Sequence, residues 1–321
     1  MNTLLIGLGS VGLEYDLILK NKFLSHAKTV NDHKRLKLKA VVDLDKKKLL
    51  RFKKRYKSEL FTSLDKALKF SNFEFVIVSV STQNLYSVFN KLKQHKSMKY
   101  ILLEKPGASN YIQFKKIYNF CKKKNINLFL NYNRTYIDLF NRSLEFLKKT
   151  KYFKITHTYS RGLKTNASHF LNLLFLQIDL PINIYVLSKK QMSGSKDFNL
   201  NILLKYKNGE IYLISNNTDV FLNETLIFSN DRKIRIDFNE NRIELFKTKK
   251  FNLLKGYKKF HKQKEKIFSI KNYQKNTLKA VIKNFDNQKL IEKLNQSNIK
   301  TLKFISLVER TLKSHKNRLI K

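Results

Sequence analysis

The strongest constraint on the fold lies in the first dozen residues of this 321-residue chain, which hold three of its eight glycines. Gly7, Gly9 and Gly12 follow directly after the apolar run Leu4-Leu5-Ile6. In a strand, turn and helix of this spacing, the first glycine permits a tight turn and the second lets a bound group approach the backbone. The third lets the helix pack closely on the strand, and the helix N-terminus then faces an anion. The sequence therefore predicts a nucleotide-phosphate site formed by Gly7, Gly9, Ser10, Val11 and Gly12.

A second strand is predicted over residues 36–43, where an apolar pattern ends in Asp43. An acid at this place can accept hydrogen bonds from ribose hydroxyls, and because no arginine follows it, we expect NAD rather than NADP. The alternative is that Asp43 only ends the strand and caps the next helix. The acid lies about ten residues later than the usual spacing of roughly twenty. We expect the additional residues to form a loop over 15–22, before a helix near 25–33.

Strand and helix patterns alternate through the first 135 residues, which predicts a doubly wound parallel sheet, that is, an NAD(P)-binding Rossmann domain over 1–135. The run 73–80 is almost continuously apolar, as in a strand buried on both faces. Ligands of such sheets bind at the carboxyl ends of the strands. The additional cofactor-binding residues expected at these ends are Ser81, Thr82, Glu104 and Lys105.

Residues 136–321 have a different pattern, which predicts a second domain with helices and a mainly antiparallel sheet. Alternating segments flank Asn208-Gly209, a pair that favours a two-residue hairpin. A helix over 164–178 is expected to cover one face of the sheet, because the other face alternates with polar residues. Two further helices are expected over 272–285 and 298–314.

Composition limits the compartment. Cys121 is the single cysteine, so no intrachain disulfide can form and a reducing cytoplasm is the expected location. No signal peptide is indicated at the N-terminus. The stretch 170–187 is interrupted by polar residues, so it is interpreted as a buried helix followed by a strand, and no membrane partner is expected.

The formal charge of +42 suggests nucleic-acid binding as an alternative function. However, lysine is spread along the chain, and arginine, the residue that most often recognises bases, is scarce. Residues with AT-rich codons are abundant, so mutational bias explains the charge as well as a polyanion does. We therefore expect no specific nucleic-acid partner, although positive potential favours a phosphorylated cofactor. No histidine or cysteine cluster has metal-ligand spacing, and no metal is expected.

Three later segments carry a resemblance. Glu104-Lys105-Pro106 ends the fifth predicted strand, residues 131–134 read Asn-Tyr-Asn-Arg, and Ser168-His169 lies in a predicted helix. Together with the glycine turn, these segments resemble the glucose-fructose oxidoreductase / inositol dehydrogenase family (Gfo/Idh/MocA) over nearly the whole chain. The resemblance implies an NAD(P)-dependent oxidoreductase acting on sugars, cyclitols or sugar derivatives, including nucleotide-linked sugars. It also implies that residues 136–321 form an α/β domain with an open, mainly antiparallel sheet, which serves substrate binding and self-association.

The resemblance also implies two catalytic residues, because the family's lysine lies beside nicotinamide and substrate and its helix histidine contacts the reacting hydroxyl. These roles carry over to Lys105 and His169. They suit the chemistry, since oxidising an alcohol needs a base for the hydroxyl proton, and histidine titrates near neutrality. The alternatives are a solvated lysine and a core histidine.

One departure concerns Thr165, which stands where many family members carry an aspartate. A second class of function is therefore a catalytically silent Rossmann nucleotide-binding or regulatory protein. The residues predicted to bind substrate are Lys105, Arg134, Arg161, Thr165, Asn166 and His169.

Overall fold

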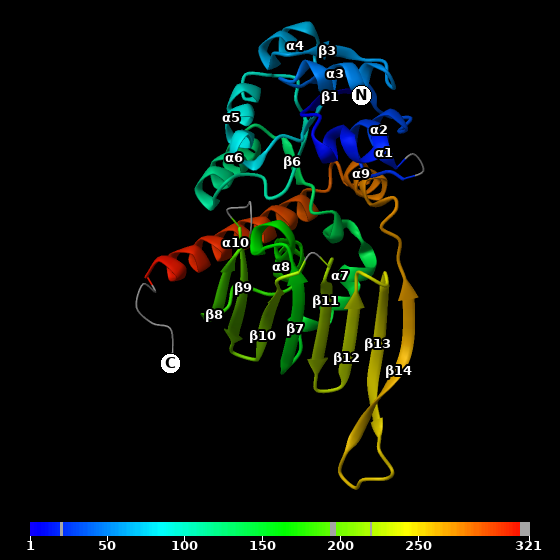
Figure 1. The fold of residues 1–321 in the computed structure, drawn as a ribbon, viewed down its shortest axis with the longest axis vertical. Helices are drawn as coiled ribbons and strands as arrows, with labels where there is room; N and C mark the ends of the chain where they lie inside the picture. Colours follow the sequence, from blue (N-terminus) through cyan, green and yellow to red (C-terminus); the bar gives the residue numbers. More distant parts are fainter. Residues whose placement is uncertain (20–21, 193–196, 219, 315–321) are drawn as a thin grey trace. The chain divides into compact units, whose positions relative to one another are not determined.

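The computed structural model describes residues 1–19, 22–192, 197–218 and 220–314 (Figure 1). The chain divides into two compact units, residues 1–137 with 271–302 and residues 138–270 with 303–321. The sequence predicted two uninterrupted domains that meet at residue 135. The structure differs at the C-terminal end, because residues 271–302 pack with the first unit.

The first unit is built on a six-stranded parallel sheet of order β3-β2-β1-β4-β5-β6. The strand order reverses between β1 and β4, which makes the carboxyl end of β1 the place where such sheets bind ligands. This arrangement confirms the predicted doubly wound fold. The strands are β1 (Asn2–Ile6), β2 (Lys37–Val42), β3 (Glu59–Phe61), β4 (Phe75–Val78), β5 (Tyr100–Leu103) and β6 (Asn127–Leu130).

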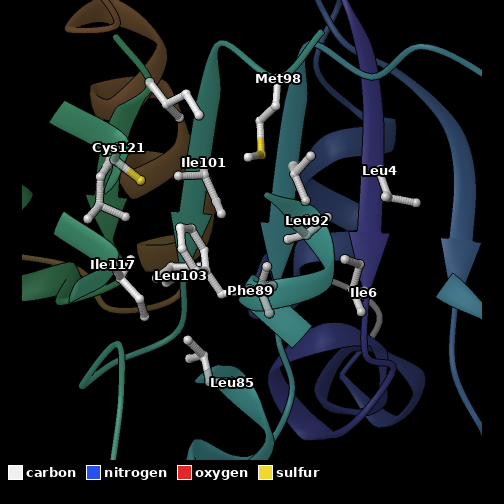
Figure 2. Close-up of a cluster of buried hydrophobic side chains, with 14 of the residues drawn as sticks. Leu4, Ile6, Leu85, Phe89, Leu92, Met98, Ile101, Leu103, Ile117 and Cys121 are labelled. Atoms are coloured by element: carbon white, nitrogen blue, oxygen red, sulfur yellow. The ribbon is translucent and has the colours of Figure 1, made fainter. Parts of the chain in front are cut away.

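One face of this sheet packs against α5 (Thr82–Leu92) and α6 (Tyr111–Lys123). Side chains from alternate strand positions, such as Leu4 and Ile101, meet Phe89 and Ile117 of these helices in a buried cluster (Figure 2). The spacing of two along a strand selects the residues that reach this face. The remaining helices of the chain's first 137 residues are η1 (Ser10–Glu14), α1 (Tyr15–Ile18), α2 (His26–Asn31), α3 (Lys46–Lys53), α4 (Leu64–Phe70) and η2 (Asn133–Tyr136).

The C-terminal segment packs on the strand residues that point away from α5 and α6. Phe285, between α9 (Tyr273–Lys283) and α10 (Gln288–Ser314), stacks on Tyr100 with ring centroids 3.9 Å apart. The amide of Asn295 on α10 donates to the Leu128 carbonyl at 2.9 Å. These contacts attach the C-terminal segment to the parallel sheet of the first unit. Helix α10 begins at Gln288, ten residues before the predicted start at 298.

The long interval between the glycine turn and β2 is helical near its start, so the predicted loop over 15–22 is wrong for residues 15–18, which form α1. Residues 20 and 21 lie outside the described part of the chain. Asp16, 3% exposed, accepts the backbone N–H of Leu24 at 3.1 Å and that of Ser25 at 2.7 Å. The additional chain is thus fixed by a buried carboxylate.

The second unit holds an eight-stranded sheet of order β14-β13-β12-β11-β7-β10-β9-β8. Only the β7–β10 pair is parallel among the described pairs, so the sheet is mainly antiparallel, as predicted. Its strands are β7 (Phe153–Ser160), β8 (Asn183–Gln191), β9 (Phe198–Tyr206), β10 (Gly209–Asn216), β11 (Asn223–Ser229), β12 (Arg232–Asp237), β13 (Arg242–Lys250) and β14 (Lys258–Ile267). Its helices, besides the end of α10, are α7 (Asp138–Leu144), η3 (Glu145–Lys148), η4 (Leu163–Ala167) and α8 (Ser168–Phe175).

Two local predictions in this unit need correction. The β9–β10 hairpin forms, but its loop residues are Lys207 and Asn208, and Gly209 pairs with Tyr206 in the ladder. Glycine is required there because a side-chain carbon would lie 2.4 Å from the Phe153 carbonyl oxygen. The helix predicted over 164–178 is a π-helical turn, η4, followed by α8. Phe170 of α8 stacks on His157 of β7 at 4.1 Å, so this helix does cover one face of the sheet.

Within the described residues, every helix is too short or too polar to cross a lipid bilayer.

Candidate cofactor and substrate site

The glycine turn has the geometry that a bound phosphate needs. Gly7 has φ +93°, and a side-chain carbon there would lie 2.4 Å from the Ser79 carbonyl oxygen. A side-chain carbon at Gly12 would lie 2.2 Å from the Gly7 carbonyl oxygen. At Gly9, by contrast, nothing lies within 4 Å of that position. The first and third glycines therefore allow the chain to pack on itself, while the second leaves backbone accessible to a ligand.

Asp43 follows β2 and ties the second strand to the glycine turn. Its Oδ2 accepts the Leu8 N–H at 2.6 Å, and its Oδ1 accepts the Asp45 N–H at 2.9 Å. Each carboxylate oxygen keeps a second acceptor site, so ribose hydroxyls can still bind. The cap of α3 is Asp45, whose Oδ1 accepts the Lys47 N–H at 2.8 Å. The alternative in which Asp43 serves as that helix cap is therefore not the observed one.

A cavity of about 660 Å³ opens beside these residues, within the first unit. This volume lies in the range of small-molecule and cofactor sites. Its walls come from the carboxyl ends of β1, β2 and β4, as the switch-point rule requires. Among the polar and glycine residues that line it are Gly7, Gly9, Asp43, Lys48, Thr62, Ser63, Ser81 and Lys91.

The other predicted cofactor residues begin the neighbouring helices. Ser10 is exposed and Val11 is half-buried in the first turn of η1, which starts after Gly9. Thr82 is the first residue of α5, after Ser81. First-turn N–H groups of a helix lack intrahelical acceptors and can bind an anion. The structure thus brings these residues to the same edge of the sheet, and their contacts with a cofactor stay a prediction.

Glu104 belongs to a buried polar network that the sequence did not predict. Its Oε1 lies 2.8 Å from His26 Nε2 and accepts the Asn131 amide at 2.5 Å. Gln274 completes the network, with its Nε2 2.9 Å from His26 Nδ1 and its Oε1 accepting from Asn131 at 3.1 Å. His26 is 1% exposed and Gln274 is fully buried. The network fixes the Glu104 carboxylate immediately before Lys105, and the predicted contact of Glu104 with a cofactor stays a prediction.

The turn that carries Lys105 is fixed on several sides. The peptide bond between Lys105 and Pro106 is cis, and the Gly107 N–H donates to the Glu104 carbonyl at 2.9 Å. The Asn298 amide donates to the Pro106 carbonyl at 3.0 Å. Gly107 has φ +86°, and a side-chain carbon there would lie 2.6 Å from Leu130. The Lys105 side chain is half-buried and starts from a defined backbone, which suits a reacting group.

Arg134, predicted to bind substrate, lies in η2 and is 9% exposed. Burial lowers the pKa of its guanidinium to about 9, so the group still carries its charge at neutral pH. A buried cation has to be compensated, because desolvation of an unpaired charge is costly. The predicted contact between Arg134 and substrate stays a prediction.

In the second unit, Thr165 is bound by an acid that the sequence analysis missed. Asp197, 5% exposed, accepts the Thr165 N–H at 2.8 Å and its hydroxyl at 2.9 Å through Oδ2. Its Oδ1 accepts the Lys164 N–H at 3.1 Å and the Phe198 N–H at 2.8 Å. A carboxylate is thus present beside Thr165, supplied from the start of β9. The single signal for Asp197 in the sequence is its position directly before β9, a strand that contains two asparagines.

Asn166 and His169 occupy different environments. The Asn166 amide donates to the Ser160 carbonyl at 2.8 Å, and its Oδ1 accepts from Asn223 at 2.9 Å. These bonds give Asn166 a structural role at the end of β7. His169 is half-buried in the first turn of α8. Both residues were predicted to bind substrate, and for both this contact stays a prediction.

Arg161 has an unusual backbone for a residue other than glycine, with φ 64°, and it precedes Gly162 with φ +88°. Such a conformation costs roughly 1–3 kcal/mol and persists only where the surroundings impose it. Gly162 is held by its N–H, which donates to Asn199 Oδ1 at 2.8 Å. The Arg161 side chain is exposed at this sharp turn. This placement is compatible with its predicted contact to an acidic group of a substrate.

No group of three histidine, cysteine, aspartate or glutamate side chains that could hold a metal is found among the described residues.

Comparison with known families supports the nucleotide site. Residues 1–132 match the family model described as "Oxidoreductase family, NAD-binding Rossmann fold". This match spans the parallel sheet, the glycine turn and the Glu104-Lys105-Pro106 segment, and it confirms the resemblance over these residues. The Ser168-His169 pair lies outside the matched range. A search of curated proteins finds no match.

Solved structures resemble the chain over almost its whole length. UDP-N-acetylglucosamine 3-dehydrogenase GnnA from Acidithiobacillus ferrooxidans has a TM-score of 0.71 at 15% identity, with 97% of each chain covered. The WlbA dehydrogenase from Bordetella pertussis, in complex with NADH and UDP-GlcNAcA, has a TM-score of 0.68 at 15% identity, covering 98% of this chain and 96% of that one. An oxidoreductase from Agrobacterium radiobacter, in complex with NAD+, L-tartaric acid and magnesium, has a TM-score of 0.68 at 16% identity, covering 95% and 94%. At these identities the similarity shows the fold.

Proposed function

We propose that this chain, whose residues 1–132 carry the NAD-binding Rossmann domain of the Gfo/Idh/MocA oxidoreductase family, is an NAD-dependent dehydrogenase or reductase of a sugar-like substrate. The reaction would move a hydride between nicotinamide and a hydroxyl or keto carbon of a sugar, cyclitol or sugar derivative. The observation that carries the proposal is the cavity at the glycine turn. It combines open space over Gly9 with the Asp43 carboxylate, and these are the features a dinucleotide needs.

The dinucleotide, when bound, supplies the hydride acceptor or donor. In this proposal the turn formed by Gly7, Gly9 and Gly12 receives its phosphates, with Gly9 as the open approach, and Asp43 binds its ribose. Lys105 polarises the reacting oxygen and His169 takes up or returns the hydroxyl proton, because an imidazole titrates near neutral pH. The rigid turn at Glu104, Pro106 and Gly107 supports this role for Lys105, since a group that acts in a transition state must be held in place.

NAD is proposed over NADP, because the Asp43 carboxylate would repel a 2′-phosphate. Nucleotide-linked sugars are included among the substrates, because two proteins of this fold are connected with them: GnnA is a UDP-N-acetylglucosamine 3-dehydrogenase, and WlbA was solved in complex with UDP-GlcNAcA. Self-association through the second sheet and a cytoplasmic location belong to the same proposal. Cys121, the single cysteine, is buried and cannot form an intrachain disulfide, as suits a reducing compartment.

The experiment that tests the function first asks for binding, then for turnover. Because the chain has no tryptophan, NADH binding can be followed by the fluorescence of NADH itself. Candidate sugars and UDP-sugars are then added with NAD, and NADH formation is recorded. Absence of binding at about millimolar cofactor, with the protein shown to be folded, would remove the premise, since KM values of enzymes are typically about 1 μM to 1 mM.

Lys105→Met separates a catalyst from a silent nucleotide-binding protein. The substitution keeps the apolar stem and removes the cation, so turnover should fall by roughly two to three orders of magnitude, as for loss of one oxyanion donor. NADH affinity should change by no more than a few-fold. Lys99→Met, at an exposed lysine before β5, is the matched control and should keep full activity. Parental turnover in Lys105→Met would refute the proposed catalytic site and favour the silent nucleotide-binding protein.

A further inference from the structure

The hairpin formed by β13 and β14 extends beyond the rest of its sheet. The last residue pair between β12 and β13 is Arg232 with Lys247, whereas β13 and β14 continue to pair as far as Lys250 with Lys258. Figure 1 shows this two-stranded ribbon, in yellow and gold, projecting past the other strands of the sheet. We call residues 247–264 the projecting hairpin. All of its β14 residues are exposed.

The projecting hairpin carries a concentrated positive charge. Its eighteen residues include eight lysines and His261, and they include no aspartate or glutamate. Lys249 lies directly opposite Lys259, and Lys250 directly opposite Lys258. Like charges placed opposite each other in a ladder are destabilising. The lysine charges therefore do not stabilise the hairpin itself.

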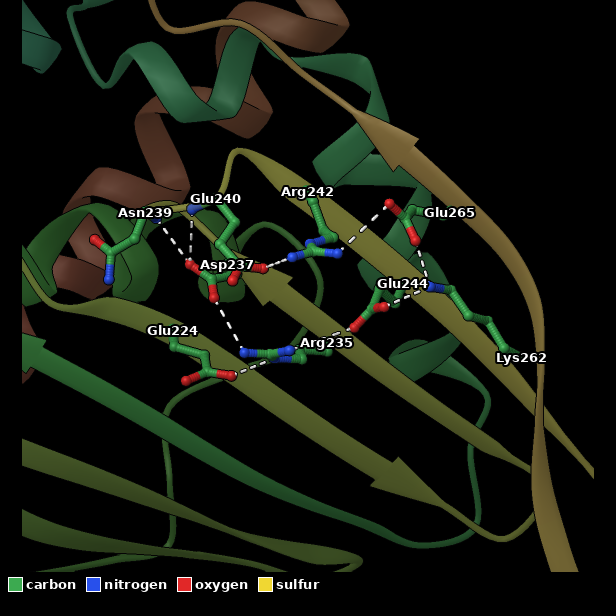
Figure 3. Close-up of polar contacts among 9 residues, drawn as sticks. All are labelled: Glu224, Arg235, Asp237, Asn239, Glu240, Arg242, Glu244, Lys262 and Glu265. Carbon is green, nitrogen blue, oxygen red and sulfur yellow. Dashed lines mark hydrogen bonds and ion pairs between the residues drawn. The ribbon is translucent and has the colours of Figure 1, made fainter.

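Five acids near the base of the hairpin are paired with basic side chains (Figure 3). Arg235 Nε lies 2.5 Å from Glu224, and Lys262 Nζ lies 2.7 Å from Glu244. Arg242 and Lys262 also contact Glu240 and Glu265. Of the eight hairpin lysines, Lys262 alone has a carboxylate within ion-pair distance among the described residues. Beyond this network the positive charge is uncompensated.

The tip of the hairpin exposes apolar side chains and has a defined turn. Leu253 is 84% exposed, Leu254 52% and Tyr257 67%. The turn closes through the Phe251 N–H to the Tyr257 carbonyl at 3.2 Å, with Gly256 at φ +84°. Neighbouring exposed leucines at the end of a projecting element contribute nothing to a core. They indicate a surface that meets an apolar partner.

We propose that the projecting hairpin docks on an anionic lipid surface, with the tip leucines and Tyr257 in the interfacial layer and the flanking lysines against the headgroups. Lysine stems reach along apolar surface while their ammonium groups stay at the polar level, and tyrosine favours the same interface. An amphipathic element with basic flanks binds membranes through buried apolar area together with attraction to anionic lipids. The hairpin has both parts.

Other partners fit these observations less well. Nucleic acid would satisfy the lysines but leaves Leu253 and Leu254 without a role, and the chain has no arginine between Arg242 and Arg310. A second copy paired hairpin to hairpin would bring eight more lysines against the same eight, so the self-association proposed above would use other strands of the second sheet. The sequence-based expectation of no membrane partner considered segments that span a bilayer. Docking at the interface needs no such segment, and it is independent of the proposed enzymatic function.

The test uses the full chain and sedimentation with two kinds of vesicle, phosphatidylcholine alone and phosphatidylcholine with phosphatidylglycerol at roughly 7:3. In about 150 mM salt we expect binding to the anionic vesicles only, because exposed charges at that ionic strength act over roughly 8 Å. One lysine near such a surface contributes about fivefold to partitioning. Replacing Lys249, Lys250, Lys258 and Lys259 by glutamine should therefore weaken binding at least about tenfold.

A second variant, Leu253→Ser with Leu254→Ser, should also weaken binding about tenfold or more, since it removes the buried apolar part. The matched control replaces four exposed lysines by glutamine, namely Lys115, Lys116 and Lys123 of α6 and Lys124, which caps that helix. It removes the same charge and should reduce binding by less than about threefold. Circular dichroism and NADH binding report that each variant remains folded.

Four results would overturn the proposal. One is failure of the parent to bind anionic vesicles, and another is equal loss in the α6 control, which would assign binding to diffuse charge. A third is that the hairpin variants weaken binding to a duplex DNA probe while vesicle binding is unchanged, which would make the partner a nucleic acid. The last is that they change the sedimentation coefficient of the free protein but not vesicle binding, which would make the hairpin a self-association element.

Discussion

Gly9 and Gly12 differ in what surrounds them, and this difference predicts opposite effects of the same substitution. In Gly12→Ala the new carbon would lie 2.2 Å from the Gly7 carbonyl oxygen and 3.0 Å from its carbonyl carbon. Ordinary contacts are 3.4–4 Å, so backbone must move by more than an ångström. In Gly9→Ala the new carbon meets nothing within 4 Å, and the φ of −67° is accessible to alanine.

The magnitudes follow from these distances. Overpacking of this kind costs about 1–3 kcal/mol, and the shifted backbone carries Gly7, so Gly12→Ala should lose both stability and cofactor affinity. Gly9→Ala should keep or raise stability by about 0.4–1 kcal/mol, because alanine restricts the unfolded chain. Its methyl group would stand where the pyrophosphate approaches. Loss of one charge-assisted hydrogen bond, about 1.5–3 kcal/mol, weakens NADH binding by roughly tenfold to a hundredfold.

Thermal unfolding followed by circular dichroism and titration with fluorescent NADH measure the two effects separately. The expected pattern is a stable Gly9→Ala that binds NADH poorly and an unstable Gly12→Ala. The reasoning is refuted if Gly9→Ala binds NADH like the parent, because the open space over the turn would then not be the approach of the phosphates. Parental stability in Gly12→Ala would show that the close approach to Gly7 is not real.

Three further predictions follow from single side chains. Asp43→Asn should shift the ratio of NADPH to NADH affinity at least about tenfold towards NADPH, because it removes a repulsive charge while Lys48 and Lys91 still line the cavity. Titration with both cofactors checks this expectation, and an unchanged ratio contradicts it. Thr165→Asp should destabilise the second unit by about 1–3 kcal/mol, since a carboxylate would replace the hydroxyl that donates to Asp197. Thr165→Ser keeps that hydroxyl and should unfold at the same temperature as the parent in thermal unfolding. Burial raises the pKa of the Cys121 thiol from 9.0 to about 12, so the contribution of the buried thiol to stability is complete below pH 9 and is lost as the pH rises from 9 to about 12. Between pH about 8 and about 10.5 the free energy of unfolding of the parent should therefore fall by about 2 kcal/mol more than that of Cys121→Ala. Urea unfolding at both pH values measures this difference, and equal losses in the two proteins would contradict it.

Much of the first unit could be predicted from local pattern. The run Leu4-Leu5-Ile6 followed by three glycines needs no distant residue to define a strand and a tight turn, because the steric freedom of glycine is a property of each residue alone. The strand at 73–80 was recognisable because burial on both faces leaves an apolar run. The helix replacing the loop at 15–18 was missed because four residues carry too little periodicity to identify a helix.

The path of the C-terminal segment could not be predicted in this way. The sequence indicates helices near 272–285 and after 288, but their amphipathic pattern states only that one face is buried, not against which sheet. In the structure Phe285 and Asn295 select the parallel sheet, through an aromatic stack on Tyr100 and an amide bond to Leu128. Contacts of this kind bring together residues more than 150 positions apart.

The sequence by itself determined the glycine turn, the acid at the end of β2 and the Glu104-Lys105-Pro106 segment, because each depends on the stereochemistry or chemistry of neighbouring residues. Only the tertiary structure decided that Gln274 reaches His26 and that Asp197 binds Thr165. The physical reason is that a buried polar group must find a partner, while nothing in its own sequence neighbourhood restricts where along the chain that partner lies. The backbone before Lys105 and the η4 turn before α8 are therefore fixed by residues that no local sequence pattern identifies.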